Sequence, residues 1–217
     1  MTDLAYPFDV TPEPAQVVEV ADGVFWIRMP LPVSLDHINL WLLRDGDGWA
    51  IVDTGMKTPE TKALWEQLFS GFMADRPVKR LICTHFHPDH FGLSGWLCRR
   101  LDIMLWMARA EYLLGAALIG GGQKNPPPEI LKFYKSAGMG KRALQKFHDA
   151  GYDNLATVMC RPPAAYRRIR DGETLTIDGR PWHLVAGRGH SPEHICLYSP
   201  DLEVMISGDQ VLPTISS

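Results

Sequence analysis

The segment LICTHFHPDHFGLSG, residues 81–95, constrains the fold of this chain more than any other. An apolar run ends there in four side chains that can bind metal ions: His85, His87, Asp89 and His90. Side chains two residues apart share one face of an extended segment, so His85 and His87 can reach the same ion. Pro88 is expected to turn the chain into a helix and to bring the last two side chains to a second ion. By chance this pattern should occur in well under about one such chain in a thousand.

Two later segments repeat this context of an apolar strand followed by a polar loop. HLVAGRGHSPEH presents His190, and LEVMISGDQVLP presents Asp209. A third imidazole would complete a neutral three-histidine set, and a carboxylate placed between two ions could contact both. We therefore add His190 and Asp209 to the candidate ligands.

The first third of the chain is typical of two β-hairpins, in residues 15–30 and 38–55, each with an Asp-Gly turn. Residues 57–73 are expected to form a helix, because Leu64, Leu68 and Phe72 recur at four-residue spacing. Alternating strands and helices follow. The pattern predicts an α/β (α+β) fold.

Residues 109–165 differ in character, with apolar helical segments separated by Gly- and Pro-rich joints. The strand pattern returns from residue 166. We expect one domain over residues 1–217, with a helical cap inserted at about 109–165. The cationic side chains from Lys132 to Arg170 are interpreted as a solvated helical face, or alternatively as a funnel for an anionic substrate.

Composition limits the classes of partner. The formal net charge of −3 provides no basic field for a nucleic acid. No stretch approaches the roughly 18 apolar residues of a membrane span, and no signal peptide is recognisable. We expect a cytoplasmic protein with a small-molecule substrate, without nucleic acid or membrane partners. The cysteines are scattered and expected to be free thiols: Cys83, Cys98, Cys160 and Cys196.

The chain resembles the metallo-β-lactamase-fold superfamily of metal-dependent hydrolases, through LDHINLWLL, WAIVDTG, CTHFHPDHFG, GRGHSPEHICLY and ISGDQVLP in the family's order. The resemblance implies a four-layer αββα sandwich that holds one or two ions at one edge, usually Zn²⁺, with Fe or Mn as alternatives. It assigns ligands as follows: His85, His87 and His190 to the first ion, Asp89 and His90 to the second, and Asp209 to both. Asp53 would orient a ligand histidine from behind.

The chain departs from this family in one respect. The family's second site is completed by a further histidine after the bridging aspartate, whereas no histidine follows His194 here. Either the chain is truncated at its C-terminus or the second site is incomplete. We favour truncation, because a sandwich without its last strands would leave a sheet edge exposed. His194 is interpreted as a structural partner rather than a ligand.

The resemblance implies a hydrolase in which Zn²⁺ lowers the pKa of bound water to about 7. Asp89 would be the catalytic group that orients the water and relays its proton. The bridging Asp209 resembles the glyoxalase II-like branch rather than true β-lactamases, so a small ester, thioester or lactone is the expected substrate. The alternatives are a mononuclear iron persulfide dioxygenase-like oxidoreductase that uses His85, His190 and Asp209, and a metal-binding domain with a degenerate second site.

Overall fold

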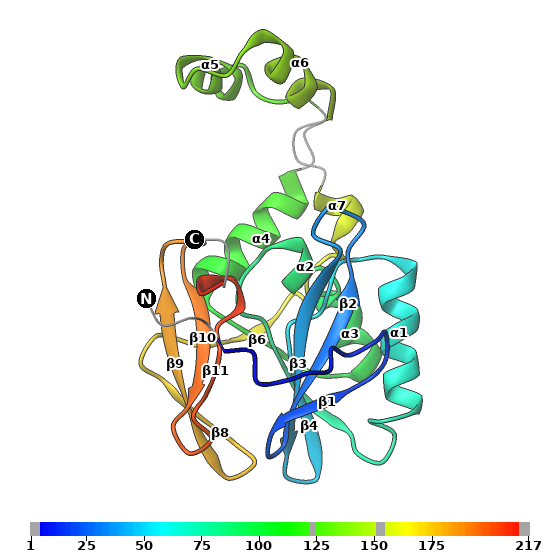
Figure 1. Ribbon diagram of the computed structural model, residues 1–217. Helices are drawn as coiled ribbons and strands as arrows, with labels where there is room; N and C mark the ends of the chain where they lie inside the picture. Colours follow the sequence, from blue (N-terminus) through cyan, green and yellow to red (C-terminus); the bar gives the residue numbers. More distant parts are fainter. Residues whose placement is uncertain (1–4, 122–124, 151–154, 213–217) are drawn as a thin grey trace.

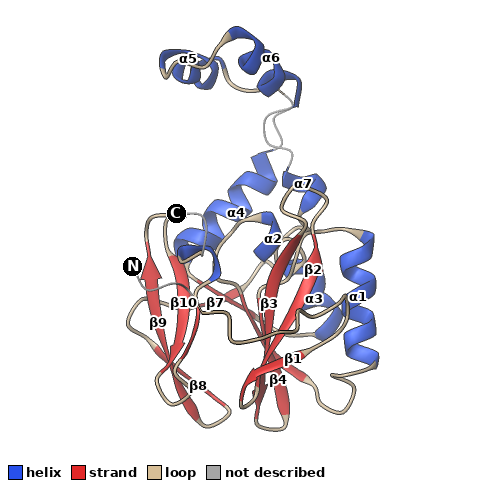
Figure 2. Cartoon of the chain, in the orientation of Figure 1, coloured by secondary structure: helices blue, strands red, loops and turns tan. Residues whose placement is uncertain are grey.

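Two β-sheets packed face to face form the body of the protein, in a computed structural model that describes residues 5–121, 125–150 and 155–212 (Figure 1, Figure 2). The first sheet has seven strands in sequential order: β1 (Val18–Ala21), β2 (Val24–Pro30), β3 (His37–Asp45), β4 (Gly48–Val52), β5 (Val78–Ile82), β6 (Leu105–Met107) and β7 (Tyr166–Arg168). Strands β1 to β4 pair antiparallel, and β4 to β7 pair parallel.

The second sheet is antiparallel and has four strands in the spatial order β11, β10, β9, β8. Their bounds are β8 (Thr174–Ile177), β9 (Arg180–Gly187), β10 (His194–Ser199) and β11 (Val204–Ile206). A short 3-10 helix, η1 (Gly208–Gln210), follows β11. The two sheets and the helices on the first one confirm the mixed α/β class expected from the sequence.

Apolar side chains fill two layers of core. Between the sheets, Leu43, Val52 and Ile82 pack against Trp182 and Ile195. On the other face of the first sheet lie α1 (Pro59–Ser70) and α3 (Ser94–Leu101), as Figure 1 shows. Such buried strands hold the residues that follow them in fixed positions, because protein interiors pack as densely as organic crystals.

Helix α1 begins where the sequence indicates and ends earlier. Thr58 caps it by accepting a hydrogen bond from the Thr61 backbone N–H. The helix ends at Ser70, so the prediction that Phe72 lies on its apolar face is wrong. Phe72 instead follows the helix and packs its ring against Phe25.

The predicted helix after the histidine cluster is two helices, α2 (Pro88–Phe91) and α3. All four cysteines are free thiols, as predicted. No helix in the described part of the chain is both long and apolar enough to cross a membrane.

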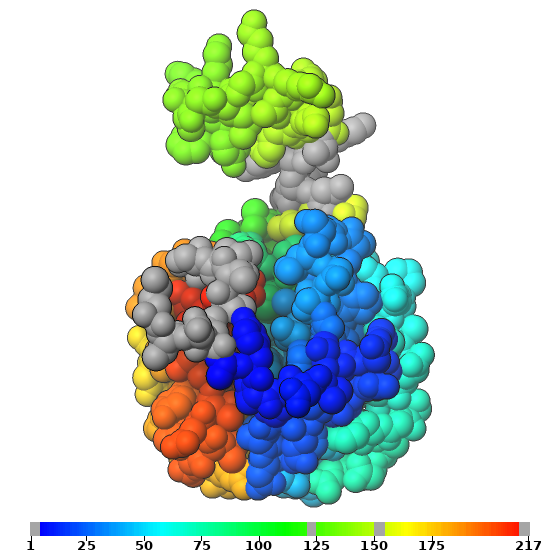
Figure 3. Space-filling model, in the orientation of Figure 1, coloured from blue at the N-terminus to red at the C-terminus, as the bar shows by residue number. Residues whose placement is uncertain are grey.

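The chain leaves the first sheet after β6 and returns at β7, where Tyr166 pairs with Leu105. Four helices lie between them: α4 (Arg109–Gly121), α5 (Pro128–Ser136), α6 (Lys141–Ala150) and α7 (Leu155–Val158). Helices α5 and α6 pack together through Tyr134 and Phe147, with ring centroids 5.0 Å apart. Figure 1 and Figure 3 show this pair standing away from the body. The helical cap expected at about 109–165 stays a prediction.

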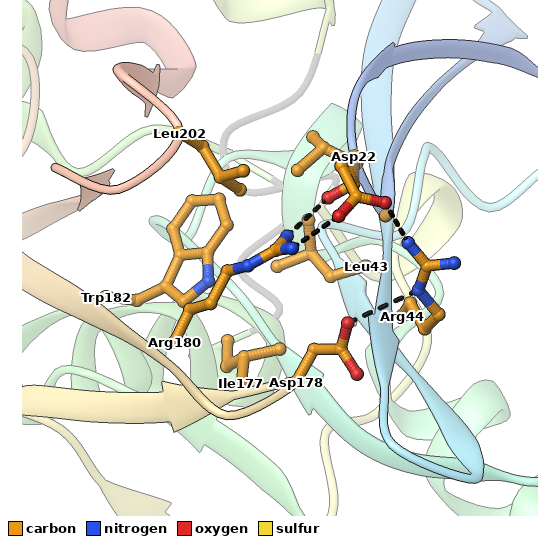
Figure 4. A pocket seen from close by; sticks show the side chains of 10 residues that line it. Asp22, Leu43, Arg44, Ile177, Asp178, Arg180, Trp182 and Leu202 are labelled. Carbon is orange, nitrogen blue, oxygen red and sulfur yellow. Dashed lines mark hydrogen bonds and ion pairs between the residues drawn. The ribbon is translucent and has the colours of Figure 1, made fainter.

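An ion network joins the turns of the two sheets at the end away from α7 (Figure 4). Asp22, in the β1–β2 turn, pairs with Arg44 on β3 and with Arg180 on β9. Arg44 Nε also lies 3.3 Å from Asp178 Oδ2, in the β8–β9 turn. Hydrogen bonds from Arg180 and Arg44 lower the pKa of Asp22.

Replacing Asp22 by Asn should lower the melting temperature, because two ion pairs lose their anion: the pair with Arg44 within the first sheet and the pair with Arg180 between the sheets. The lowered pKa means that this stabilisation is present above the ordinary value of 3.8 and is lost as the pH falls through the folded-state value. The difference from wild type should also shrink between 0.1 and 1 M salt, because the Debye length falls from about 10 to about 3 Å. Thermal unfolding of Asp75→Asn, an exposed carboxylate paired only with its neighbour Arg76, is the control. Equal melting temperatures for wild type and Asp22→Asn at pH 7 would contradict the prediction.

Candidate metal centre

The candidate ligands lie in the segments that follow the carboxyl ends of three strands, β5, β9 and β11, and Asp53 follows a fourth, β4. Strands β4 and β5 are parallel, so the residues that follow them, Asp53 and the Thr84-His85 pair, meet at the same edge of the first sheet. In the second sheet, His190 follows β9 and Asp209 follows β11. The backbone N–H of Ile195 on β10 donates to the Thr84 carbonyl at 3.0 Å, which joins the second sheet to the first loop.

Three imidazoles form the first set. His85 Nε2 lies 2.9 Å from His87 Nδ1, and His190 Nε2 lies 3.2 and 2.9 Å from those two atoms. Two nitrogens bound to one tetrahedral zinc ion at about 2.05 Å would be about 3.4 Å apart. Three ring nitrogens that converge at nearly this spacing fit a shared cation.

Asp89, His90 and Asp209 form the second set. His90 Nε2 lies 3.6 Å from Asp89 Oδ2 and 3.2 Å from Asp209 Oδ1. This nitrogen is buried and has no hydrogen-bond partner among the described residues, which suits a metal ligand. The other oxygen of Asp209 lies 3.4 Å from His190 Nε2, so its carboxylate faces both sets.

Asp53 supports the second set from behind. Its carboxylate accepts three hydrogen bonds of 2.8 Å, from the Thr84 backbone N–H, the Thr84 hydroxyl and His90 Nδ1–H. The last bond leaves the lone pair of His90 on Nε2, directed at Asp89 and Asp209. Asp53 has a left-handed φ of 65°, which aspartate tolerates better than most residues.

Electrostatics differ between the two sets. Burial and the neighbouring imidazoles lower the pKa of His85, and burial together with His190 lowers the pKa of His87. These rings are therefore neutral and can donate lone pairs. Burial alone would lower the pKa of His90, but Asp53, Asp209 and Asp89 outweigh it and raise this pKa well above its usual value. The second set thus lies in a negative field, which favours a cation.

The structure brings together all six residues expected to be ligands, and it places Asp53 against His90. Their binding of ions remains a prediction. His194 lies outside both sets: its Nε2 accepts from the Asp209 backbone N–H at 3.1 Å, and its ring stacks on His85. This position fits its interpretation as a structural partner.

Sequence reasoning missed Glu111, in the first turn of α4. It is fully buried and accepts hydrogen bonds from the backbone of Phe86, between two candidate ligands, and from Ser191, next to a third. The only local signal is an acidic residue at the start of a helix, which is common because it complements the helix dipole.

Comparison with known proteins identifies the family. The model of the metallo-beta-lactamase superfamily matches residues 33–216. The chain therefore belongs to this superfamily.

Individual relatives are longer than this chain. Acyl-coenzyme A thioesterase MBLAC2 of Homo sapiens is 27% identical over 201 residues, which cover 88% of this chain and 64% of the relative. Probable metallo-hydrolase YqjP of Bacillus subtilis is 24% identical over 201 residues, which cover 90% of this chain and 59% of the relative. A beta-lactamase domain protein from Burkholderia ambifaria, known from its crystal structure, is 42% identical in sequence and superposes with a TM-score of 0.82. The match covers 97% of this chain and 62% of that protein. The chain thus spans about three fifths of each relative's length.

Replacing Asp53 by Asn should lower both the melting temperature and the affinity for a metal ion. One oxygen becomes an NH₂ group that cannot accept a hydrogen bond, so at least one buried donor loses its partner. This loss should lower the free energy of unfolding by about 1–3 kcal/mol. Loss of a group that orients a ligand typically weakens metal binding by about 10–100-fold. Thermal unfolding and a zinc titration measure the two effects.

Asp102→Asn is the matched control, because Asp102 also has a left-handed φ, 53°, but is exposed at the end of α3. Its metal affinity should equal that of wild type. An Asp53→Asn protein with wild-type metal affinity would show that Asp53 does not support the second set.

Proposed function

We propose that this chain carries the site of a metal-dependent hydrolase that cleaves an acyl thioester with water activated by two metal ions, zinc first among them. The observation that carries the proposal is the position of Asp209, whose two carboxylate oxygens face two separate sets of candidate ligands. The thioester substrate is supported by the human relative, which is named as an acyl-coenzyme A thioesterase.

The donor atoms support zinc without requiring it. Both sets consist of imidazole nitrogens and carboxylate oxygens, which suit Zn, Fe and Mn. When bound, such ions lower the pKa of water to about 7 and polarise a carbonyl group. Two zinc ions per chain would favour hydrolysis, whereas a single iron would favour the dioxygenase alternative.

Asp89 is the proposed general base. Its side chain is about one-fifth exposed and lies beside His90 at the rim of the second set, so it can reach both water and substrate. Its carboxylate would orient the water and accept its proton while the oxygen attacks the thioester carbonyl carbon. The C–S bond would then break, and Asp89 would return the proton to the leaving sulfur, which gives a carboxylic acid and a free thiol.

The hydroxyl of Ser191 does not compete for the role of nucleophile at this position. Ser191, next to His190, is buried and donates its hydroxyl to Glu111 Oε1 at 2.8 Å. Its proton is thus engaged with a carboxylate that also binds other donors. This arrangement supports attack by water rather than by serine.

Replacing His190 by Ala should remove one ion and abolish thioester hydrolysis, because the first set loses one of its three imidazoles. Metal content per chain and release of free thiol from acyl-coenzyme A measure the two effects. His183→Ala is the control, since His183 lies exposed on β9 and bonds to Thr174. Lactone and phosphodiester substrates complete the panel. Retained activity with full metal content in His190→Ala would overturn the assignment of this ligand.

A further inference from the structure

Glu111 links the two loops that carry the three-histidine set. Its Oε2 accepts from the Phe86 backbone N–H at 3.0 Å, and Phe86 lies between His85 and His87. Its Oε1 accepts from the Ser191 hydroxyl at 2.8 Å and from the Glu193 backbone N–H at 2.6 Å. One carboxylate thereby connects the loop after β5 with the loop after β9.

The first turns of α4 reinforce this link. The Ala110 backbone N–H donates to Glu193 Oε2 at 3.1 Å, so the second loop and the helix bind each other in both directions. One turn after Glu111, Gly115 lies against Phe86 and Phe91: a Cβ at Gly115 would come within 3.2 Å of Phe86 Cβ. Helix α4 therefore contacts both the backbone of Phe86, through Glu111, and the side chain of Phe86, at Gly115.

The burial of Glu111 needs a reason, because a carboxylate without solvent is costly unless its lone pairs are occupied. Three donors occupy them, and all three belong to loops that carry candidate ligands. Asp53 is a second buried carboxylate beside the site. It binds Thr84 and His90 and so contacts the second set of candidate ligands. No donor is shared between the two carboxylates.

We propose that Glu111 is a positioning residue that sets the distance between the His85–His87 loop and the His190 loop, and thereby the affinity for the ion held by these three histidines. Asp53 supports the second set independently. The inference rests on the proposed function, because it requires that the three histidines bind a metal ion.

The test is a zinc titration of the metal-free, intact protein against a chromophoric chelator. Glu111→Gln keeps the volume and one acceptor oxygen, but its NH₂ group must face a donor. Glu111→Ala removes all the acceptors. We expect affinity for the ion that His190→Ala eliminates to fall by about 10–100-fold, and more for Ala than for Gln. In a His190→Ala background, Glu111→Gln should leave binding of the remaining ion unchanged.

Asp45→Asn is the matched control. Asp45 is another buried carboxylate, bound to Arg80 at 2.7 Å, but it lies at the opposite end of the strands. It should lower the melting temperature without changing zinc affinity. Glu111 variants that lose stability as Asp45→Asn does, yet bind zinc like wild type, would overturn the inference and leave the proposed function intact. A wild-type protein that binds no metal would overturn both.

Discussion

The hydrogen bonds of the Asp53 carboxylate hold the candidate site to the fold. Asp53 follows β4 directly, and it binds the backbone and the hydroxyl of Thr84, which follows β5, as well as His90 in α2. The Thr84 carbonyl in turn accepts from Ile195 in the second sheet. Through these bonds one buried side chain connects two strands of the first sheet, helix α2 and the second sheet.

This connection explains how side chains far apart in the sequence come within hydrogen-bonding distance of one another. His85 and His190 are 105 positions apart, yet their Nε2 atoms lie 3.2 Å from each other. Each follows a strand whose inward side chains are buried between the sheets, such as Ile82 and Leu184. Dense packing of these strands limits how far their ends can move. The carboxylates of Asp53 and Glu111 then hold the loops beyond those ends.

The part of the site that could be predicted is the part formed by residues close to one another in the sequence. The His-x-His-x-Asp-His cluster could be recognised because its members are close neighbours in the chain, and the hairpins because Asp-Gly turns separate apolar runs. Glu111 could not be recognised, since its role arises only when α4 packs on two loops distant in the sequence. The packing of α5 against α6 could not be predicted for the same reason: amphipathic spacing indicates a helix but not the surface on which it packs.

The two sets differ in a way that bears on their chemistry. The first offers three imidazoles and one oxygen of Asp209, whereas the second offers His90 with two carboxylates. Four donors saturate a tetrahedral ion, but three leave a position free, and catalytic zinc sites keep such a position for water. A second ion held by Asp89, His90 and Asp209 would therefore have room for water beside the partly exposed Asp89. On this argument the short ligand list of the second set is compatible with catalysis, and the hydrolase proposal does not depend on a further histidine.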